Sequence, residues 1–299
     1  MKRTSRSSRP ARPAAPARIL VVGAHPDDPE CMAGGCAALW TAAGHVVKFL
    51  TMTNGDAGHH EMGGGPLALR RRTEALAAAR VLKIEYEISD CHDGELMPTL
   101  ENRRELIRRI RAFHPDLVLT HPPDDYHPDH RYTSLLVQDS AMSVTVPNIC
   151  PLTPALRANP IFGYILGTRG VSRAFRPDVL VDIGSVLTQK LAMIECHKSQ
   201  FLEWIPYLEG AMDQVPERPA ARRAFVAKHR KAVMRECADR FRADLIALHG
   251  AMRGAKIAYV EAIEICPFGS SLDEAARRRL FPFEGEHHSV RGGSPANAN

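Results

Sequence analysis

The chain has no long hydrophobic run and no closely spaced cysteine pair. Among its 299 residues, no stretch approaches the roughly 20 apolar residues that a membrane-spanning helix needs. Its seven cysteines are scattered without a C-x-x-C pair, and an odd, scattered set indicates reduced thiols. We therefore expect no membrane span, no disulfide framework and a cytoplasmic location.

Acidic residues are absent from the first eighteen positions, which hold six basic residues. Because the formal charge of the whole chain is only +5, the remainder is close to neutral, which argues against a nucleic-acid partner. The segment is rich in Arg, Pro, Ala and Ser, so it cannot bury enough apolar surface to fold alone, and it lacks the apolar stretch of a secretory signal. We expect one domain at 18–283 between disordered tails at 1–17 and 284–299.

A glycine-rich phosphate turn is missing after the first expected strand. A Rossmann-type nucleotide-binding module needs such a turn. Here the sequence His25-Pro-Asp-Asp28 follows the strand, and Gly34 and Gly35 come too late. Carboxylates at that point would repel a pyrophosphate, so a nucleotide-binding module is disfavoured. A phosphohydrolase stays conceivable only if a metal bridges to phosphate.

Strand and helix patterns alternate along the chain. Short β-branched runs indicate strands buried on both faces, and segments with helical periodicity separate them. The expected strands are 18–24, 45–52, 84–89, 116–120 and 179–183; the expected helices are 33–43, 66–82, 99–113, 132–143 and 185–199; a charged helical region at 216–252 and a late strand at 256–266 follow. This alternation predicts a Rossmann-like, doubly wound α/β fold: a mostly parallel sheet with helices on both faces and a C-terminal helical and strand elaboration.

Histidines and aspartates follow two of these strands. The first strand leads into Ala24-His-Pro-Asp-Asp28, and the fourth is followed by residues 121–130, which end in His127-Pro-Asp-His130. In open α/β sheets, ligands bind beyond the carboxyl ends of the strands, where the winding reverses. With a 3-2-1-4-5 strand order, the first and fourth strands are neighbours at that reversal. The spacing therefore predicts that both loops face one crevice.

The residue types in these two loops suit a hydrolytic metal ion. Neutral imidazoles and a carboxylate are good zinc ligands, and three of them leave a position for a water whose pKa zinc lowers to roughly 7. Asp27 and Asp28 are adjacent in an expected loop, so one can ligate the metal while the other acts as a general base. Two histidines and one carboxylate also describe non-haem iron oxygenases, but their all-β barrels do not fit this pattern.

The two motifs together resemble the LmbE-like or PIG-L family of zinc-dependent N-acetylglucosaminyl deacetylases. The resemblance runs from about Arg18 to Phe283. Weaker matches are Gly34-Gly35, Thr53-Asn54-Gly55-Asp56, Arg71-x-x-Glu74, Asp93-Gly94, Lys190 and His197-x-Ser199-Gln200. One departure is Pro29, which separates Asp28 from Glu30, whereas many family members place the acid directly after the second aspartate.

The resemblance implies a role for each motif residue. The implied zinc ligands are His25, Asp28 and His130; the implied catalytic residues are Asp27 as general base, His127 to stabilise the oxyanion or protonate the leaving amine, and Asp129 to orient a neighbouring histidine. Arg71 and Asp93 match positions that contact the sugar in relatives.

The implied reaction is hydrolysis of an N-acyl amide, expected to be N-acetyl, on an amino sugar or glycoconjugate, which releases acetate and the free amine. The implied cofactor is Zn²⁺, with Fe²⁺ or another divalent metal as the alternative. The implied partner is a small N-acetylated molecule, and a homo-oligomer stays open.

The remaining polar residues near these motifs have simpler interpretations. Asp124 and Asp125 are expected to form a turn. His121 either lines the crevice or is a hydrogen-bonded loop residue. His59 and His60, in a glycine-rich loop, are expected to be exposed to solvent.

Two further sites stay undecided at this level. His197, on an expected helix, is either packed in the core or part of the pocket lining. The run of arginines at 70–72 is expected to be a solvated helix start, although one of the three could point into the cleft.

Overall fold

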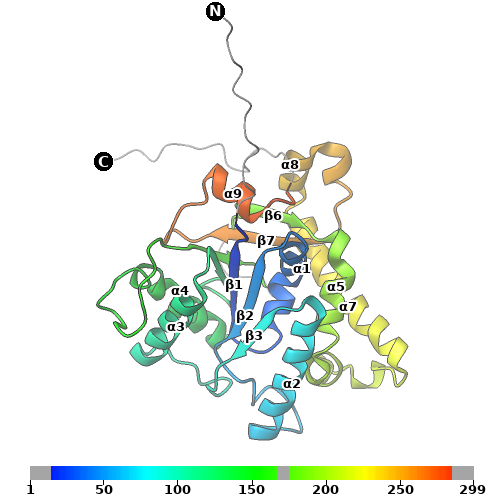
Figure 1. Ribbon diagram of the computed structural model, residues 1–299. Helices are drawn as coiled ribbons and strands as arrows, with labels where there is room; N and C mark the ends of the chain where they lie inside the picture. The colour runs from blue at the N-terminus through cyan, green and yellow to red at the C-terminus, as the bar shows by residue number, and fades with distance from the viewer. Residues whose placement is uncertain (1–14, 168–174, 285–299) are drawn as a thin grey trace, which may run out of the picture.

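A mixed β-sheet runs through the protein, with helices on both of its faces (Figure 1). The computed structural model describes residues 15–167 and 175–284. Within these ranges the strands are β1 (Arg18–Gly23), β2 (Val46–Thr51), β3 (Glu85–Ile88), β4 (Leu117–Thr120), β5 (Ile161–Ile165), β6 (Val179–Asp182) and β7 (Val260–Ile265). They lie in the order β3-β2-β1-β4-β5-β7-β6.

The first five strands form the parallel part of the sheet. β1 pairs in parallel with β2 and β4, β2 with β3, and β4 with β5, whereas β7 runs antiparallel to both β5 and β6. The predicted α/β class, the 3-2-1-4-5 order and the late strand that returns to the sheet are therefore present. The identity of the fifth strand was wrong: Ile161–Ile165 lies beside β4, and the predicted segment at 179–183 forms the far edge.

The helices bury the two faces of the sheet in separate cores. The longer helices are α1 (Asp28–Ala42), α2 (Gly64–Leu82), α3 (Leu100–Phe113), α4 (Pro128–Ser143), α5 (Leu187–Ile194), α7 (Pro219–Arg240) and α8 (Arg242–Gly254); α6 (Ile205–Leu208) and α9 (Glu274–Leu280) are short. In β1, Ile19 and Val21 pack in one core with residues of α1, α2 and α5, whereas Leu20 and Val22 pack in the other with residues of α3 and α4. This alternation explains the continuous apolar run, since a strand covered on both faces needs apolar residues at every position.

Two helices begin earlier than the sequence predicted. α1 begins at Asp28 and α4 at Pro128, so both metal-type motifs form helix N-termini where only loops were expected. Pro29 and Pro128 lie in the first turns, where a missing amide hydrogen costs nothing. Close packing makes the first transition possible: a Cβ on Gly23 would lie 2.8 Å from Asp28 Cβ and 2.8 Å from Pro29 Cδ.

The predicted tails lie largely outside the described residues, which exclude 1–14 and 285–299. At the inner ends of the predicted tails, Ala17 is buried and its amide donates to His45 Nδ1 at 3.1 Å, while Arg277 donates to Glu284 at 2.9 Å. All seven cysteines fall in the described ranges and are free. No described helix combines the length and the apolar character needed to cross a bilayer.

Gly35 is where α1 packs most closely on the C-terminal elements. A Cβ at this position would lie 2.5 Å from Ile183 Cγ2 and 2.8 Å from Glu261 Oε1. We therefore expect Gly35→Ala to lower the free energy of unfolding by about 1–3 kcal/mol, the usual cost of overpacking, in urea denaturation followed by circular dichroism. Gly65→Ala is the control, because no atom lies within 4 Å of a Cβ there. Equal stability of the two variants would contradict the packing described here.

Candidate metal centre

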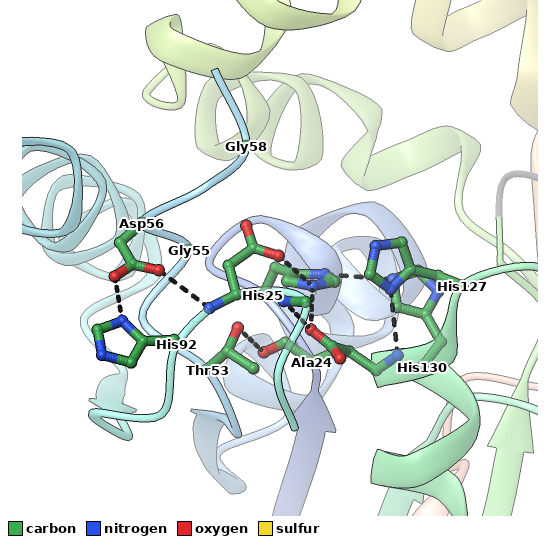
Figure 2. Close-up of polar contacts among 12 residues, drawn as sticks. Ala24, His25, Thr53, Gly55, Asp56, Gly58, His92, His127 and His130 are labelled. Carbon is green, nitrogen blue, oxygen red and sulfur yellow. Dashed lines mark hydrogen bonds and ion pairs between the residues drawn. The ribbon is translucent and has the colours of Figure 1, made fainter. Parts of the chain in front are cut away.

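The loops after β1 and β4 meet beyond the carboxyl ends of these strands. Figure 2 shows His25, His127 and His130 turned toward one another. His25 Nδ1 lies 3.3 Å from Asp28 Oδ2 and 3.3 Å from His130 Nε2. His130 Nε2 lies 3.5 Å from the same Asp28 oxygen. Three atoms, one from each predicted zinc ligand, therefore surround one point.

The spacing of these three atoms fits a tetrahedral zinc ion. Zinc binds nitrogen and oxygen ligands at about 2.0–2.2 Å, so two ligand atoms on a tetrahedron stand about 3.3–3.6 Å apart. The three observed separations of 3.3, 3.3 and 3.5 Å match that edge. Two imidazoles and one carboxylate are also a donor set that zinc accepts, with one position left over.

Carboxylates hold the outer nitrogens of both histidines. His25 Nε2 lies 3.2 Å from Asp129 Oδ2 and 3.1 Å from Asp93 Oδ1, and His130 Nδ1 lies 2.9 Å from Asp125 Oδ1. A histidine that binds a metal commonly donates its other N–H to a carboxylate, which fixes the tautomer and the ring orientation. These contacts leave His25 Nδ1 and His130 Nε2 as acceptors on the inner side.

Asp125 is a positioning residue that sequence reasoning missed. It was expected only in a turn, but its Oδ1 also accepts the amide of His127 at 3.1 Å. The rule that metal-binding histidines have a carboxylate partner was the available signal, because Asp125 lies five positions before His130. Asp129, which the resemblance implied as an orienting residue, contacts His25 across the two loops.

Three overlapping sets of side chains in the described ranges have the proximity that a metal needs: His25, His127 and His130; Asp28, His121 and His130; and His25, Asp93 and Asp129. His121 Nε2 shares the amide of Ala24 with Asp28 Oδ2, and each accepts it at 3.0 Å. Asp93 and Asp129 face the outer nitrogen of His25, so they orient this ring from behind. The predicted set of His25, Asp28 and His130 draws its members from the first two clusters, and Asp28 Oδ2 also accepts the amides of Ala24 and His25 at 3.0 and 2.7 Å.

Asp27 holds an unusual backbone conformation beside this point. Its φ of 128° lies in the region that favours glycine, and such strain persists only where the surroundings enforce it. Arg71 does so by donating to the Pro26 carbonyl at 2.7 Å and to Asp27 Oδ1 at 3.1 Å. Burial raises the pKa of Asp27 to about 6, although the charge of Arg71 lowers it. A carboxylate that exchanges a proton near neutral pH is suited to general base catalysis.

Arg71 and Asp93, predicted to contact the sugar, are bound to the protein on several sides. Arg71 is 2% exposed and also donates to the Gly55 carbonyl at 3.2 Å and to Asp93 Oδ2 at 3.5 Å. Burial would raise the pKa of Asp93, but His25 and Arg71 lower it to about 2. Both residues line the cavity in front of the centre. These contacts indicate that Arg71 positions Asp27.

His127 presents one nitrogen to the cavity. It is the N-cap residue of α4, and its Nδ1 accepts the amide of Asp129 at 3.2 Å. The neutral ring therefore carries its proton on Nε2, because the tautomer follows from the partner of the other nitrogen. Burial and the neighbouring His25 and His130 lower the pKa of His127, which keeps it neutral.

The surroundings shift the pKa values of two predicted ligands in opposite directions. Burial alone would lower the pKa of His25, but contacts with Asp129, Asp28 and Asp93 raise it well above its ordinary value. Burial would raise the pKa of Asp28, but the nearby His130 and His121 lower it far below its usual range. A metal therefore has to displace a proton from His25, so metal affinity falls as the pH falls.

Two polar networks behind the centre connect the weaker motif residues. Buried Glu30 lies 2.9 Å from His197 Nε2 and accepts from the Tyr86 hydroxyl at 3.3 Å. His197 is therefore a fully buried partner of Glu30. Asp56 Oδ1 accepts the Asp93 amide at 3.0 Å, which holds the loop that carries Asp93 (Figure 2).

Hydrogen bonds from Ser199 and Gln200 hold the segment that follows α5 against α2 and the loop before it. The amide and hydroxyl of Ser199 donate to Glu74 at 3.0 and 2.6 Å, and Gln200 Nε2 donates to the Gly58 carbonyl at 3.0 Å. The following π-helical turn, η2 (Gln200–Trp204), continues into α6. The motif residues at 74, 199 and 200 thus position a wall beside the metal ligands.

A cavity of about 590 Å³ opens in front of the centre. Its polar lining includes the three predicted zinc ligands, Asp27 and His127. Its apolar lining includes Phe201, Trp204 and Ile205. The predicted exposure of His59 and His60 was wrong: His59 Nε2 lies 2.8 Å from Glu203 Oε2, and the ring of His60 stacks on Tyr207 at 4.3 Å. Both histidines of the glycine-rich loop therefore pack against residues that follow η2 or lie within it.

Comparison with known proteins gives a consistent family relationship. The PIG-L family model, described as GlcNAc-PI de-N-acetylase, matches residues 20–141. A diacetylchitobiose deacetylase of Thermococcus kodakarensis is 32% identical over 204 residues, which cover 64% of this chain and 74% of that protein. A 4-oxalmesaconate hydratase of Pseudomonas putida is 28% identical over 203 residues, which cover 65% of this chain and 78% of that protein. A solved N,N'-diacetylchitobiose deacetylase from Pyrococcus horikoshii has the same fold, with a TM-score of 0.64, 23% identity and 84% coverage of both chains.

Removal of one inner ligand should lower zinc occupancy directly, whereas loss of an orienting carboxylate should only weaken the affinity. We expect His130→Ala to bind zinc substoichiometrically and Asp125→Asn to bind it about 10–100-fold more weakly, measured by competition with a chromophoric chelator. Asp213→Asn, on an exposed turn away from the centre, is the control and should match the unmodified protein. Full zinc occupancy in His130→Ala would remove this residue from the ligand set.

Loss of Arg71 should shift the pH dependence of turnover. The base form of Asp27 is the deprotonated one, and the charge of Arg71 lowers its pKa. In Arg71→Met that pKa rises, so the acidic limb of the kcat/KM profile should move to higher pH, with activity partly recovered there. Exposed Arg72→Met is the control. An unchanged acidic limb in Arg71→Met would show that Arg71 does not act on the catalytic carboxylate.

Proposed function

This chain belongs to the PIG-L family of de-N-acetylases, and from that membership we propose that it is a zinc-dependent hydrolase that removes an N-acetyl group from an amino sugar or glycoconjugate. Family membership supports the reaction class, hydrolysis of an amide C–N bond. The observation that carries the proposal is the convergence of His25 Nδ1, Asp28 Oδ2 and His130 Nε2 at tetrahedral spacing. Asp27, which belongs to none of the metal-type clusters, lines the same cavity.

The first half of the reaction needs a base and an oxyanion donor. A divalent ion at this site would supply Lewis acidity to the acyl carbonyl and to the attacking water. Asp27 takes a proton from that water as its oxygen forms a bond to the carbonyl carbon. His127 donates from Nε2 to the oxyanion, and one preorganised donor of this kind contributes about 3–4 kcal/mol.

The second half needs an acid, because an amine anion is a very poor leaving group. Asp27 now carries the proton it removed, and its pKa of about 6 lets it give that proton up again. The proton goes to the departing nitrogen as the C–N bond breaks. The products are acetate and the free amine, and Asp27 returns to its starting state while Arg71 holds it in place.

The cavity supports a sugar-sized substrate. Its volume of about 590 Å³ lies within the range of small-molecule sites. Trp204 and Phe201 form an apolar side opposite the polar centre, an arrangement that suits a ring with one apolar face and several hydroxyl groups. A larger hollow of about 820 Å³, next to β6 and α8, contains none of the clustered metal-type residues.

A second candidate reaction is hydration of an unsaturated carboxylic acid. The likeness to the Pseudomonas putida hydratase favours it, since the same fold evidently serves both reactions. The two reactions differ in their products, because hydration releases no amine. Consumption of 4-oxalmesaconate without release of amine from any N-acetyl sugar would assign the chain to this class.

Replacement of the base should separate chemistry from metal binding. We expect Asp27→Asn to keep one zinc ion and to lose about 10²–10⁴-fold in kcat, the usual contribution of a general acid–base group. The assay is fluorimetric amine release from N-acetylglucosamine and diacetylchitobiose with zinc-loaded protein, with acetate measured in parallel. The exposed-site variant Asp213→Asn should keep full activity. Loss of zinc from Asp27→Asn would contradict the separate roles of Asp27 and Asp28.

A further inference from the structure

A buried arginine from α7 reaches the wall of the active-site cavity. Arg230 is only 8% exposed, and it lines both the main cavity and a small side pocket of about 90 Å³. Its guanidinium carbon lies 5.4 Å from the centre of the Phe201 ring. Arg230 lies outside the segment 20–141 that the family model matches.

The guanidinium of Arg230 lacks polar partners in the described part of the chain. Its Nε and Nη2 atoms are shielded from solvent and have no hydrogen-bond partner there. Exposed Glu209 lines the same two cavities but forms no ion pair with it in the described ranges. A buried charged donor without a partner is costly, so such groups are normally paired. The contact with Phe201 offsets only part of that cost.

The other positive groups of the cavity already have partners. Arg71 is engaged by Asp27, Asp93 and two carbonyls, and the outer nitrogens of His25 and His130 face carboxylates. Among the lining residues that the structure describes, Arg230 therefore offers the strongest unused attraction for a negative charge. A guanidinium presents N–H donors in a fork that matches the oxygens of carboxylate and phosphate groups.

We propose that Arg230 binds an anionic group of the substrate, a carboxylate or a phosphate ester, while the N-acetyl group lies at the metal centre. The proposal rests on the proposed deacetylase function and narrows its substrate to acidic N-acetyl amino sugars. The bound anion accepts hydrogen bonds from the Arg230 guanidinium, whose Nε and Nη2 atoms otherwise lack a partner among the described residues.

Substrate preference gives the first test. We expect zinc-loaded protein to cleave N-acetylglucosamine 6-phosphate, N-acetylglucosamine 1-phosphate or the carboxylate-bearing N-acetylmuramic acid with higher kcat/KM than neutral N-acetylglucosamine. Arg230→Met should lower kcat/KM for the preferred anionic substrate about 10- to 100-fold, mostly through KM, and should lower it far less for the neutral sugar. Arg230→Lys should recover part of the loss, and exposed Arg223→Met on the same helix is the control. Equal losses for neutral and anionic sugars would overturn the proposal.

Anion binding and stability give a readout that does not depend on turnover. Inorganic phosphate and malonate should raise the Tm of the zinc-loaded protein, and Arg230→Met should reduce that rise. Anion binding at the metal occurs in both the unmodified protein and the variant, so it does not contribute to the difference between their Tm shifts. Without an anion, Arg230→Met should be at least as stable as the unmodified protein, because it removes unpartnered buried donors. A lower Tm for the variant, or equal anion responses, would show a structural role only. Absence of amine release from every sugar would instead refute the deacetylase, and the anion response would still decide the role of Arg230.

Discussion

Contacts between carboxylates and imidazoles, made across two loops, are the constraint on which the site depends. His25 follows β1, yet its Nε2 is held 3.2 Å from Asp129, a residue of α4. This contact turns Nδ1 toward Asp28 and His130, because the two ring nitrogens point in different directions. The sheet allows it, since β1 and β4 are parallel neighbours with Val22 opposite Thr120. Two segments far apart in the chain therefore present their ligands to one point.

The cavity is lined by two different parts of the chain. The metal-type residues and the base lie within the segment 20–141 that the family model matches. Another part of the cavity wall comes from residues 200–233, which include the π-helical turn and part of α7. Contacts from Ser199 to Glu74 and from Gln200 to Gly58 join the two parts.

The sequence predicted the centre of the fold better than its periphery. Strands β1 and β4 contain continuous apolar runs, which mark strands buried on both faces, and the run of β2 is interrupted only by Lys48. β5 was not predicted, because Gly163 interrupts its five residues. Glycine at this position leaves room for Leu119, since a Cβ there would lie 3.0 Å from the Leu119 side chain. The packing of His59 and His60 was not predictable, because the covering residues Glu203 and Tyr207 come much later in the chain. The pairing of Glu30 with His197 likewise depends on tertiary contacts that no local pattern records.

The central claim is that a divalent ion binds between two loops with one carboxylate left free as a base. Anomalous diffraction at the zinc edge, on crystals of the zinc-loaded protein, tests it most directly. We expect one strong peak about 2.0–2.2 Å from His25 Nδ1, an Asp28 oxygen and His130 Nε2, with Asp27 outside the coordination sphere. A peak coordinated instead by His121 or Asp27, or no peak at this point, would contradict the proposed arrangement.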